Sequence, residues 1–535
     1  MERLRILTAE SVVTMDPAQP VAEAVLLRGG AVERVGTRGE LQHLAPEAPV
    51  VDLPGATVVP GLVESHVHPG ATAMTSASAD CRSPRCTSIA DIHTALAERL
   101  TLDSGWVRGW GYDDTLLAEM RHPTRDDLDR VHRDRPIVLT HISGHFAVAN
   151  SRALELAGVS EGTVDPDEAG FPRHPEGRLT GLLQGMPAMG RVFAHVPRPT
   201  VGQVRDGIRA FLRDATAQGV TTVHDLGVGL NAGLEELTVY RGLDAAGELP
   251  LHVVGFLRGD LVLDAAPGEL PFAESTASAG RFRLAGAKVW ADGSIQGLTA
   301  ALRFPYHCRP EHRGELGMDA RELARVCARA ADAGAQVAVH ANGDAAVEAT
   351  VAALAPLQRN RADELAPHRI EHCQVSTAED LDAIRTAGLG VSFFVNHVYH
   401  WGDRHRSMFL GPDRADDLDP LAWADGRGQL FGMHSDCPVT PLDPLRTIWT
   451  AVSRRTRDGS VLGGHQRLTV HRALQAMTTD SHWLVGDHRR VGALRAGQRA
   501  DLVAVDTALL DVDEDGLRNA RASAVMVEGD WAVAP

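Results

Sequence analysis

Apolar residues recur along this chain in short runs that alternate with segments of helical periodicity. Runs of this kind indicate strands buried on both faces, and the helical segments between them indicate parallel strands joined by crossover helices. Eight runs follow this pattern: residues 57–68, 219–227, 250–258, 282–293, 335–344, 368–374, 388–394 and 429–438. The pattern therefore predicts an α/β fold, a (β/α)8 TIM-like barrel, whose functional residues lie at the carboxyl ends of the strands.

The two ends of the chain carry a different pattern of short β-type stretches. Residues 1–58 include AVERVG, and residues 481–535 include ASAVMVEGDWAV. Neither end is long enough to bury a core alone, so we expect both to pair into one small composite β domain. Residues 59–480 then form the barrel. Its segment 75–205 is too long for one crossover, and we expect a helical insertion over the barrel mouth.

Ionisable side chains stand at or near the ends of several predicted barrel strands. The first run ends in His66-Val67-His68, and residues at i and i+2 of a strand face the same side. The full set is His66, His68, Lys288, His340, His372 and Asp436. Each alone is more typical of ordinary structure, such as a hydrogen-bonded histidine, a surface lysine or a turn aspartate. Their joint placement at successive strand ends favours a metal centre.

Imidazole and carboxylate ligands without cysteine suit an open site for Zn²⁺, with Fe, Mn or Ni as alternatives. An ammonium beside a dication carries a heavy electrostatic cost, so we expect Lys288 to be a carbamate formed with carbon dioxide. Such an anion would bridge two ions. One would be held by His66, His68 and Asp436, and the other by the two remaining histidines of the set. A single ion without the carbamate is the alternative.

A bound metal lowers the pKa of a water molecule towards about 7, which makes hydroxide available at neutral pH. Asp436 is placed to take the proton of that water and to deliver it to a leaving nitrogen. The residues therefore predict hydrolysis of a carbon–nitrogen bond, with Asp436 as the general acid/base. Two alternatives stay open: a deaminase on the same scaffold, and a metal-binding scaffold protein without turnover.

Several motifs together resemble a known family. They are PGLVESHVH from residue 60, GRLTGLL from 177, KVWADGS from 288, VAVHANGD from 337, RIEHCQ from 369 and HSDCPVTPLDPL from 434. With them the chain resembles the amidohydrolase superfamily and, within it, amidohydrolase family 3, the branch that includes N-substituted formamide deformylases. The resemblance implies the same metal ligands, a carboxylated Lys288 and a β-sandwich built from both ends. It also implies hydrolysis of a non-peptide amide, formamide or cyclic amide.

The resemblance also points to residues that contact the substrate. His145, in SGHFAVAN, resembles a family histidine of the insertion over the site. Asn396, His397 and Tyr399 follow the seventh run, where loops shape the pocket of a barrel. A packing role is at least as compatible with each of these residues. The segment GWGYDD often reads GWD in relatives, so we expect the pocket wall that includes Trp110 to differ here.

Composition narrows the choice of partner. The formal charge is −17 at pH 7, from 53 Lys+Arg against 70 Asp+Glu, which disfavours nucleic acid and anionic membrane surfaces. The N-terminus lacks the apolar core of a secretory signal, and no window reaches about 18 consecutive apolar residues. Six scattered cysteines do not make a disulfide framework. We therefore expect a cytoplasmic enzyme with a small-molecule substrate, and homo-oligomers remain compatible with the sequence.

Overall fold

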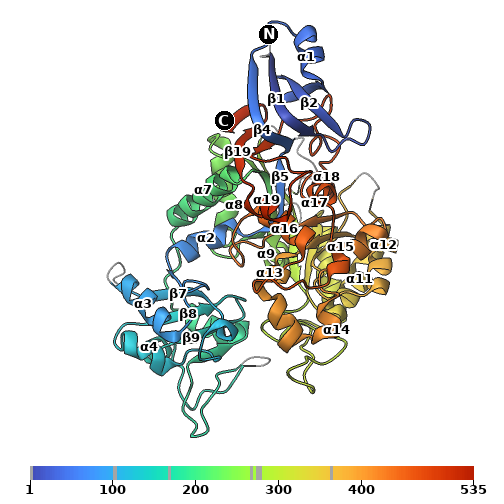
Figure 1. Cartoon of the computed structure of the whole chain (residues 1–535). Helices are drawn as coiled ribbons and strands as arrows, with labels where there is room; N and C mark the ends of the chain where they lie inside the picture. The colour runs from blue at the N-terminus through green and yellow to red at the C-terminus, as the bar shows by residue number, and fades with distance from the viewer. Residues whose placement is uncertain are drawn as a thin grey trace. The chain divides into compact units, whose positions relative to one another are not determined.

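The computed structural model describes residues 4–100, 105–166, 170–265, 269–270, 272, 280–361 and 365–535. The chain divides into two compact units (Figure 1). The first consists of Met1–Pro69 with Ile208–Pro535, and the second consists of Gly70–Gly207. Helices α2 (Pro69–Ser76) and α7 (Val201–Ala217) contain the two points of division. No helix in the described part of the chain has the length and apolar character needed to cross a membrane.

Eight parallel strands form the central sheet of the first unit, in the order β17-β16-β15-β14-β13-β12-β11-β5. Their bounds are β5 (Leu62–Val67), β11 (Val220–Val228), β12 (His252–Arg258), β13 (Phe282–Trp290), β14 (Gln336–Ala341), β15 (Arg369–His372), β16 (Gly390–Phe393) and β17 (Phe431–Met433). Each predicted run coincides with one of these strands, and β11 extends one residue beyond its run. Nearly all their residues are buried, which is why they read as apolar runs. The predicted TIM-like barrel is confirmed.

Hydrogen bonds tie the first barrel strand to the last. The Ser65 hydroxyl of β5 donates to the carbonyl oxygen of Met433 in β17 at 2.9 Å. The backbone N–H of His68 donates to the carbonyl oxygen of Cys437, also at 2.9 Å. Strand β5 pairs with β11 on its other side. The first and last strands therefore meet, and residues at their carboxyl ends share one rim.

Helices of the first unit pack apolar faces against the barrel. In α10, Asp319 caps the start by accepting the backbone N–H groups of Arg321 and Glu322. The buried face of α10 then recurs at helical spacing: Leu323, Val326, Cys327 and Ala330. The helices are α8 (Leu234–Ala245), α9 (Gly259–Asp264), α10 (Ala320–Asp332), α11 (Asp344–Arg359), α12 (Ala378–Thr386), α13 (Asn396–Arg404), η2 (His405–Phe409), α14 (Pro412–Ala415), α15 (Leu421–Gly426), α16 (Pro444–Ser453), η3 (Gly464–Gln466), α17 (Val470–Ala476) and α18 (Thr479–Trp483).

A seven-stranded sheet joins the two ends of the chain, and the blue and red strands lie side by side in Figure 1. Its order is β20 (Asp530–Val533), β19 (Ala522–Val527), β18 (Leu502–Val505), β4 (Val50–Pro60), β1 (Leu4–Val13), β2 (Val21–Arg28) and β3 (Ala31–Gly36), with α1 (Arg38–Leu44) and α19 (Glu514–Asn519) in the connections. The two ends meet where β4 and β18 pair antiparallel. The domain boundaries at 58 and 481, and the description as a sandwich, stay predictions.

The second unit holds a five-stranded sheet as well as helices, so the prediction of a helical insertion describes only part of it. The sheet order is β10 (Leu182–Gln184), β9 (Phe146–Ala149), β8 (Ile137–His141), β7 (Val107–Tyr112) and β6 (Ala79–Asp80). Around it are α3 (Ile89–Leu100), η1 (Asp114–Leu116), α4 (Arg125–Val131), α5 (Ser151–Leu156) and α6 (Met186–Phe193). These strands are short and β7 is interrupted by Gly109 and Gly111, so their period-2 signal is weak beside the longer helices.

Gly61 lies between β4 and β5, where the chain leaves the terminal sheet and enters the barrel. A Cβ atom at this position would lie 2.1 Å from Thr221 Oγ1 and 2.7 Å from Thr221 Cβ. We expect Gly61→Ala to lower the free energy of unfolding by about 1–3 kcal/mol through overpacking. Chemical denaturation measures the change. Gly242→Ala, in α8 with no heavy atom within 4 Å of the new Cβ, is the control and should not destabilise. An equal loss in both variants would contradict the close approach.

Candidate metal centre

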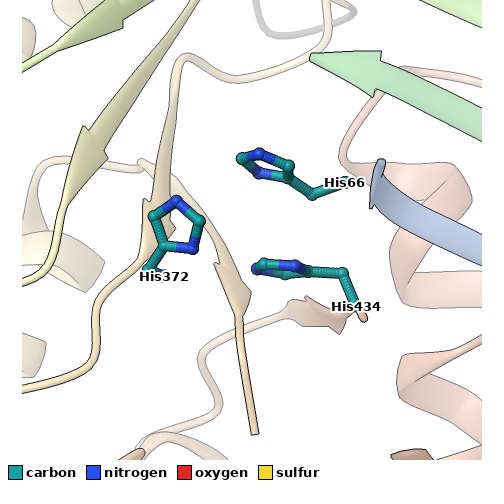
Figure 2. Close-up of side chains that lie close together, drawn as sticks. All are labelled: His66, His372 and His434. Carbon is teal, nitrogen blue, oxygen red and sulfur yellow. The ribbon is translucent and has the colours of Figure 1, made fainter. Parts of the chain in front are cut away.

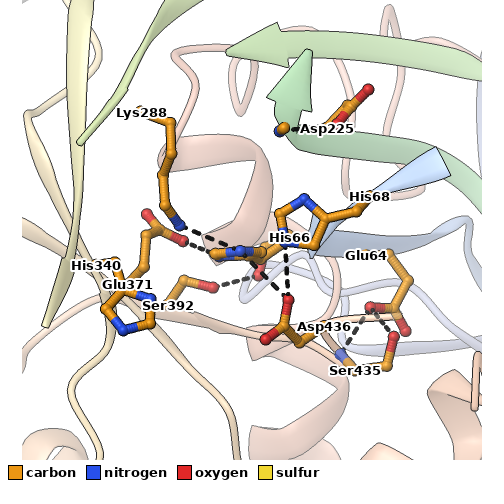
Figure 3. Close-up of polar contacts among 12 residues, drawn as sticks. Glu64, His66, His68, Asp225, Lys288, His340, Glu371, Ser392, Ser435 and Asp436 are labelled. Atoms are coloured by element: carbon orange, nitrogen blue, oxygen red, sulfur yellow. Dashed lines mark hydrogen bonds and ion pairs between the residues drawn. The ribbon is translucent and has the colours of Figure 1, made fainter. Parts of the chain in front are cut away.

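The first predicted ligand group comes together at the rim of the barrel. The Nε2 atom of His66 lies 3.5 Å from Asp436 Oδ1, and the Nε2 atom of His68 lies 3.1 Å from the same oxygen (Figure 3). Two ligands of one tetrahedral ion, each about 2.0–2.1 Å from it, lie about 3.3 Å apart. These three side chains are therefore spaced as ligands of one cation.

Lys288 joins this group from β13. Its Nζ atom is buried and lies 3.2 Å from His66 Nε2. Burial lowers the pKa of Lys288 to about 8, although the charges of Glu371 and Asp436 oppose the shift. Burial, followed by the charge of Lys288, holds the pKa of His66 well below its usual value. The centre therefore favours a neutral imidazole, which is the form that binds metals.

The second predicted pair lies beside the first. The rings of His340 and His372 are 4.4 Å apart between centroids, and His372 is 4.8 Å from His66. The Nε2 atom of His340 lies 3.0 Å from the carbonyl oxygen of Gly293. The side-chain amide nitrogen of Asn342 lies 3.0 Å from the same nitrogen of His340. Among the described residues, His372 Nδ1 has no hydrogen-bond partner.

Backbone conformation sets two of these side chains. His372 and Asp436 have φ of 71° and 53°, in the left-handed region that non-glycine residues rarely adopt. Each such residue costs on the order of 1–3 kcal/mol, and proteins retain it where the surrounding structure determines it. Both lie at the carboxyl ends of barrel strands, where the strain turns functional side chains towards the centre.

His434, which lies two residues before Asp436, was not predicted as a site residue. Its ring stacks on His66 with centroids 4.6 Å apart and a 17° angle, and it lies 5.2 Å from His372 (Figure 2). His434 is fully buried, and neither ring nitrogen has a hydrogen-bond partner in the described part of the chain. Ring nitrogens of the three histidines approach within 4.8 Å of one another. The i, i+2 rule that found His66 and His68 would have found His434 and Asp436.

Buried carboxyl groups surround the histidines of β5. Glu64 accepts the backbone N–H of Ser435 at 2.9 Å and its hydroxyl at 3.0 Å, and burial raises the pKa of Glu64 to about 8. Asp225 accepts the Tyr240 hydroxyl at 2.6 Å, and burial raises its pKa to about 7. Neither acid was predicted, because each lies within a strand rather than at its end.

Two of the predicted substrate residues on α13, Asn396 and Tyr399, make packing contacts within the protein. The side-chain amide of Asn396 donates to Thr440 Oγ1 at 3.3 Å and Thr447 Oγ1 at 3.2 Å. The Tyr399 ring lies 5.7 Å from the ring of Trp449 in α16. His397 differs, because its ring lies 4.1 Å from Phe394, which stacks on His434. A substrate contact for His397 stays a prediction.

Trp110 and His145 lie in the second unit, and their contacts with substrate also stay predictions. Burial lowers the pKa of His145 to about 4, so it is neutral at physiological pH. A further cluster in this unit consists of Asp113, Asp114 and His141. The backbone N–H of Ser143 donates to His141 Nδ1 at 3.1 Å, so a neutral His141 carries its proton on Nε2. That nitrogen lies 3.2 Å from Asp114 Oδ1, and a protonated nitrogen does not bind a cation.

The donor set at the barrel rim fits a divalent cation, since it combines buried imidazoles with one carboxylate. Ring nitrogens of His68, His372 and His434 have no hydrogen-bond partner among the residues that the structure describes. Fold and site together define a parallel-barrel protein with a candidate metal centre at the carboxyl ends of its strands. A model of the amidohydrolase family, Amidohydro_3, matches residues 49–533. The chain belongs to this family and is a hydrolase acting on carbon–nitrogen bonds other than peptide bonds, as its motifs predicted.

Known proteins resemble the chain along nearly its whole length. It is 28% identical to N-substituted formamide deformylase of Arthrobacter pascens, with 99% of this chain and 98% of that protein covered. It is also 28% identical to the putative amidohydrolase YtcJ of Bacillus subtilis, with 90% of each covered. A crystal structure of an uncharacterized metal-dependent hydrolase from Pyrococcus horikoshii OT3 has a TM-score of 0.76 at 24% identity, with coverage of 96% and 99%.

The place of His434 among the other histidines gives a test. His434→Phe keeps an aromatic ring beside His66 and removes two buried nitrogens without partners. We expect the metal-free variant to be as stable as the metal-free wild type, because no hydrogen bond is lost. The rise in melting temperature on adding Zn²⁺ should be smaller in the variant, since one nitrogen near the ion is gone. Differential scanning fluorimetry measures both quantities. An undiminished rise would show that His434 only packs.

Proposed function

We propose that this protein is a metal-dependent amidohydrolase that cleaves an amide, formamide or cyclic amide bond of a small molecule. The observation that carries the proposal is the convergence of His66, His68 and Asp436 at ligand spacing, with the Lys288 amine beside them. The similarity to an N-substituted formamide deformylase favours formamides among the candidate substrates. The net charge of −17 supports a small, non-anionic substrate rather than a nucleic acid.

The proposed ligands divide into two groups. His66, His68 and Asp436 would hold one ion, and His340 with His372 would hold the other. The donors are nitrogen and oxygen atoms, which suits Zn²⁺ and also accommodates Fe, Mn or Ni. The chemistry of the donor set therefore supports an open catalytic site rather than a closed structural one.

We propose that Lys288 is a carbamate in the working enzyme. Its amine lies in the barrel interior against a ring nitrogen of His66, and burial lowers its pKa to about 8. The neutral amine that this favours can add to the carbon of carbon dioxide, forming an N–C bond and releasing one proton. The resulting anion would supply oxygen ligands to both groups of histidines.

Asp436 is the proposed general acid/base. A bound divalent ion would supply Lewis acidity and lower the pKa of a water molecule. Oδ1 of Asp436 faces His66 and His68, which leaves Oδ2 to take a proton from the nucleophile. The same oxygen can deliver that proton to the leaving nitrogen as the carbon–nitrogen bond breaks. The barrel fixes this carboxylate through the left-handed backbone at Asp436.

Replacing Asp436 tests this role. We expect Asp436→Asn to lower kcat/KM by at least about 10²-fold, because an amide cannot shuttle the proton. The assay follows the acid and the amine released from N-substituted formamides and N-substituted amides, and the ring-opened amino acid formed from cyclic amides. Release of free ammonia instead would favour a deaminase. Asp382→Asn is the control, because Asp382 lies on α12 and forms an exposed ion pair with Arg427. An active Asp436→Asn enzyme would contradict the proposal.

Removing the metal gives a second test. Dialysis against a chelator should abolish hydrolysis and lower the melting temperature, since an ion at 100 times its Kd stabilises the fold by about 2.7 kcal/mol. Zn²⁺ with bicarbonate should restore activity, and elemental analysis should find two ions per chain. Lys288→Met should bind fewer ions and lose any benefit from bicarbonate. Full activity after complete metal removal would rule the mechanism out.

A further inference from the structure

A buried ion pair lies beside His66 in the barrel interior. Arg369 and Glu371 are both on β15 and both fully buried. The Nε atom of Arg369 donates to Glu371 Oε1 at 2.5 Å, and Nη2 donates to Oε2 at 3.0 Å. This is the two-pronged geometry in which arginine and carboxylate bind most strongly. Glu371 is therefore held in a fixed orientation.

The same carboxylate reaches the first metal ligand. Oε2 of Glu371 lies 2.7 Å from His66 Nδ1 (Figure 3). An ionised carboxylate only accepts, so the proton of the neutral His66 ring is on Nδ1. The lone pair is then on Nε2, the atom that faces Asp436 and Lys288. Glu371 thus determines which nitrogen of His66 can bind a cation.

Arg369 is anchored to several strands of the barrel. Its Nη2 atom donates to the carbonyl oxygen of Ser65, the residue before His66, at 2.8 Å. Its Nη1 atom donates to His224 Nδ1 of β11 at 3.1 Å. The guanidinium also lies 5.5 Å from the ring centre of Phe256 in β12. Contacts to β5, β11 and β12 leave the Arg369 side chain little freedom. Glu371 is held in place in turn, because its carboxylate is hydrogen-bonded to Arg369.

We propose that Arg369 and Glu371 are positioning residues that present His66 Nε2 to the metal. The inference rests on the proposed metal centre, because it assigns a role towards an ion at that nitrogen. Stability alone is a weak reason for this arrangement, since buried ion pairs are often no more stable than apolar side chains of similar size. A carboxylate behind a metal-binding histidine instead strengthens the ligand and fixes its tautomer.

Glu371→Gln tests the proposal at nearly constant volume. Its amide can present NH₂ to His66 Nδ1, which moves the ring proton to Nε2 and blocks that ligand. We expect one of the bound ions to bind about 10–100-fold more weakly. Competition with a chromophoric chelator measures the affinity for Zn²⁺. The visible absorption of Co²⁺-loaded protein should also change, which a purely structural role would not cause.

Two further variants provide a control and a substitute for Glu371→Gln. Ser392→Ala is the matched control, because Ser392 is buried in the neighbouring strand β16 and contacts Ser65 Oγ at 2.7 Å rather than His66. It should bind Zn²⁺ as the wild type does. Glu371→Asp keeps the charge and withdraws the carboxylate from His66 by one methylene, so it should also weaken binding. It serves as the test variant if Glu371→Gln does not fold.

The outcomes separate the two proposals. A wild-type protein that binds no metal overturns the metal centre itself. A wild type that binds metal, with unchanged affinity and Co²⁺ spectrum in the folded Glu371 variants, overturns the positioning role and leaves the metal centre intact. Weaker binding in the Glu371 variants, with normal binding in Ser392→Ala, supports the role.

Discussion

The register of the parallel barrel strands is the constraint on which the site depends. His340 of β14 pairs with Glu371 of β15, and Glu371 pairs with Ser392 of β16. Ser392 in turn pairs with Gly432 of β17, two residues before His434. Residues almost 100 positions apart in sequence therefore lie at one level of the barrel. A slip of one residue in any pair would turn the side chains of that strand to the opposite face and take its ligand away from the others.

Several ionisable groups are buried at this level of the barrel. Their burial and their neighbouring charges determine which of them are protonated. Arg369 and Glu371 neutralise each other. Lys288 lies against a ring nitrogen instead of forming a close ion pair, so burial lowers its pKa to about 8. Burial also keeps His66 and His372 neutral. Burial thus raises the fraction of Lys288 that is a neutral amine, the form that reacts with carbon dioxide, and keeps the imidazoles in the unprotonated form that binds metals.

Full burial made the barrel predictable, because a strand covered on both faces reads as a continuous apolar run. The candidate ligands at the strand ends were predicted from the same runs. Glu371 could not be found in this way, because strict alternation places it and His372 on opposite faces, whereas both contact His66. The left-handed backbone of His372 breaks the alternation, and no residue type in the sequence signals it. In the second unit only the extended segment around β8 was expected from the sequence, because the other strands are too short to show a period.

The ligands of such a centre perform the chemistry, but the residues around them choose the substrate. In this chain a row of packed rings connects the candidate metal ligand His66 to helix α13. The ring of His434 stacks on His66, Phe394 stacks on His434, and His397 of α13 packs on Phe394. Fully buried Asp419, with φ of 46°, lies 3.8 Å from His397 Nδ1 at the far end of this row. Because a close-packed interior transmits small displacements, we expect a change in the packing of α13 to shift the ring of His66, a candidate metal ligand. If His397 contacts the substrate as predicted, this row of rings couples substrate choice to the geometry of the candidate centre.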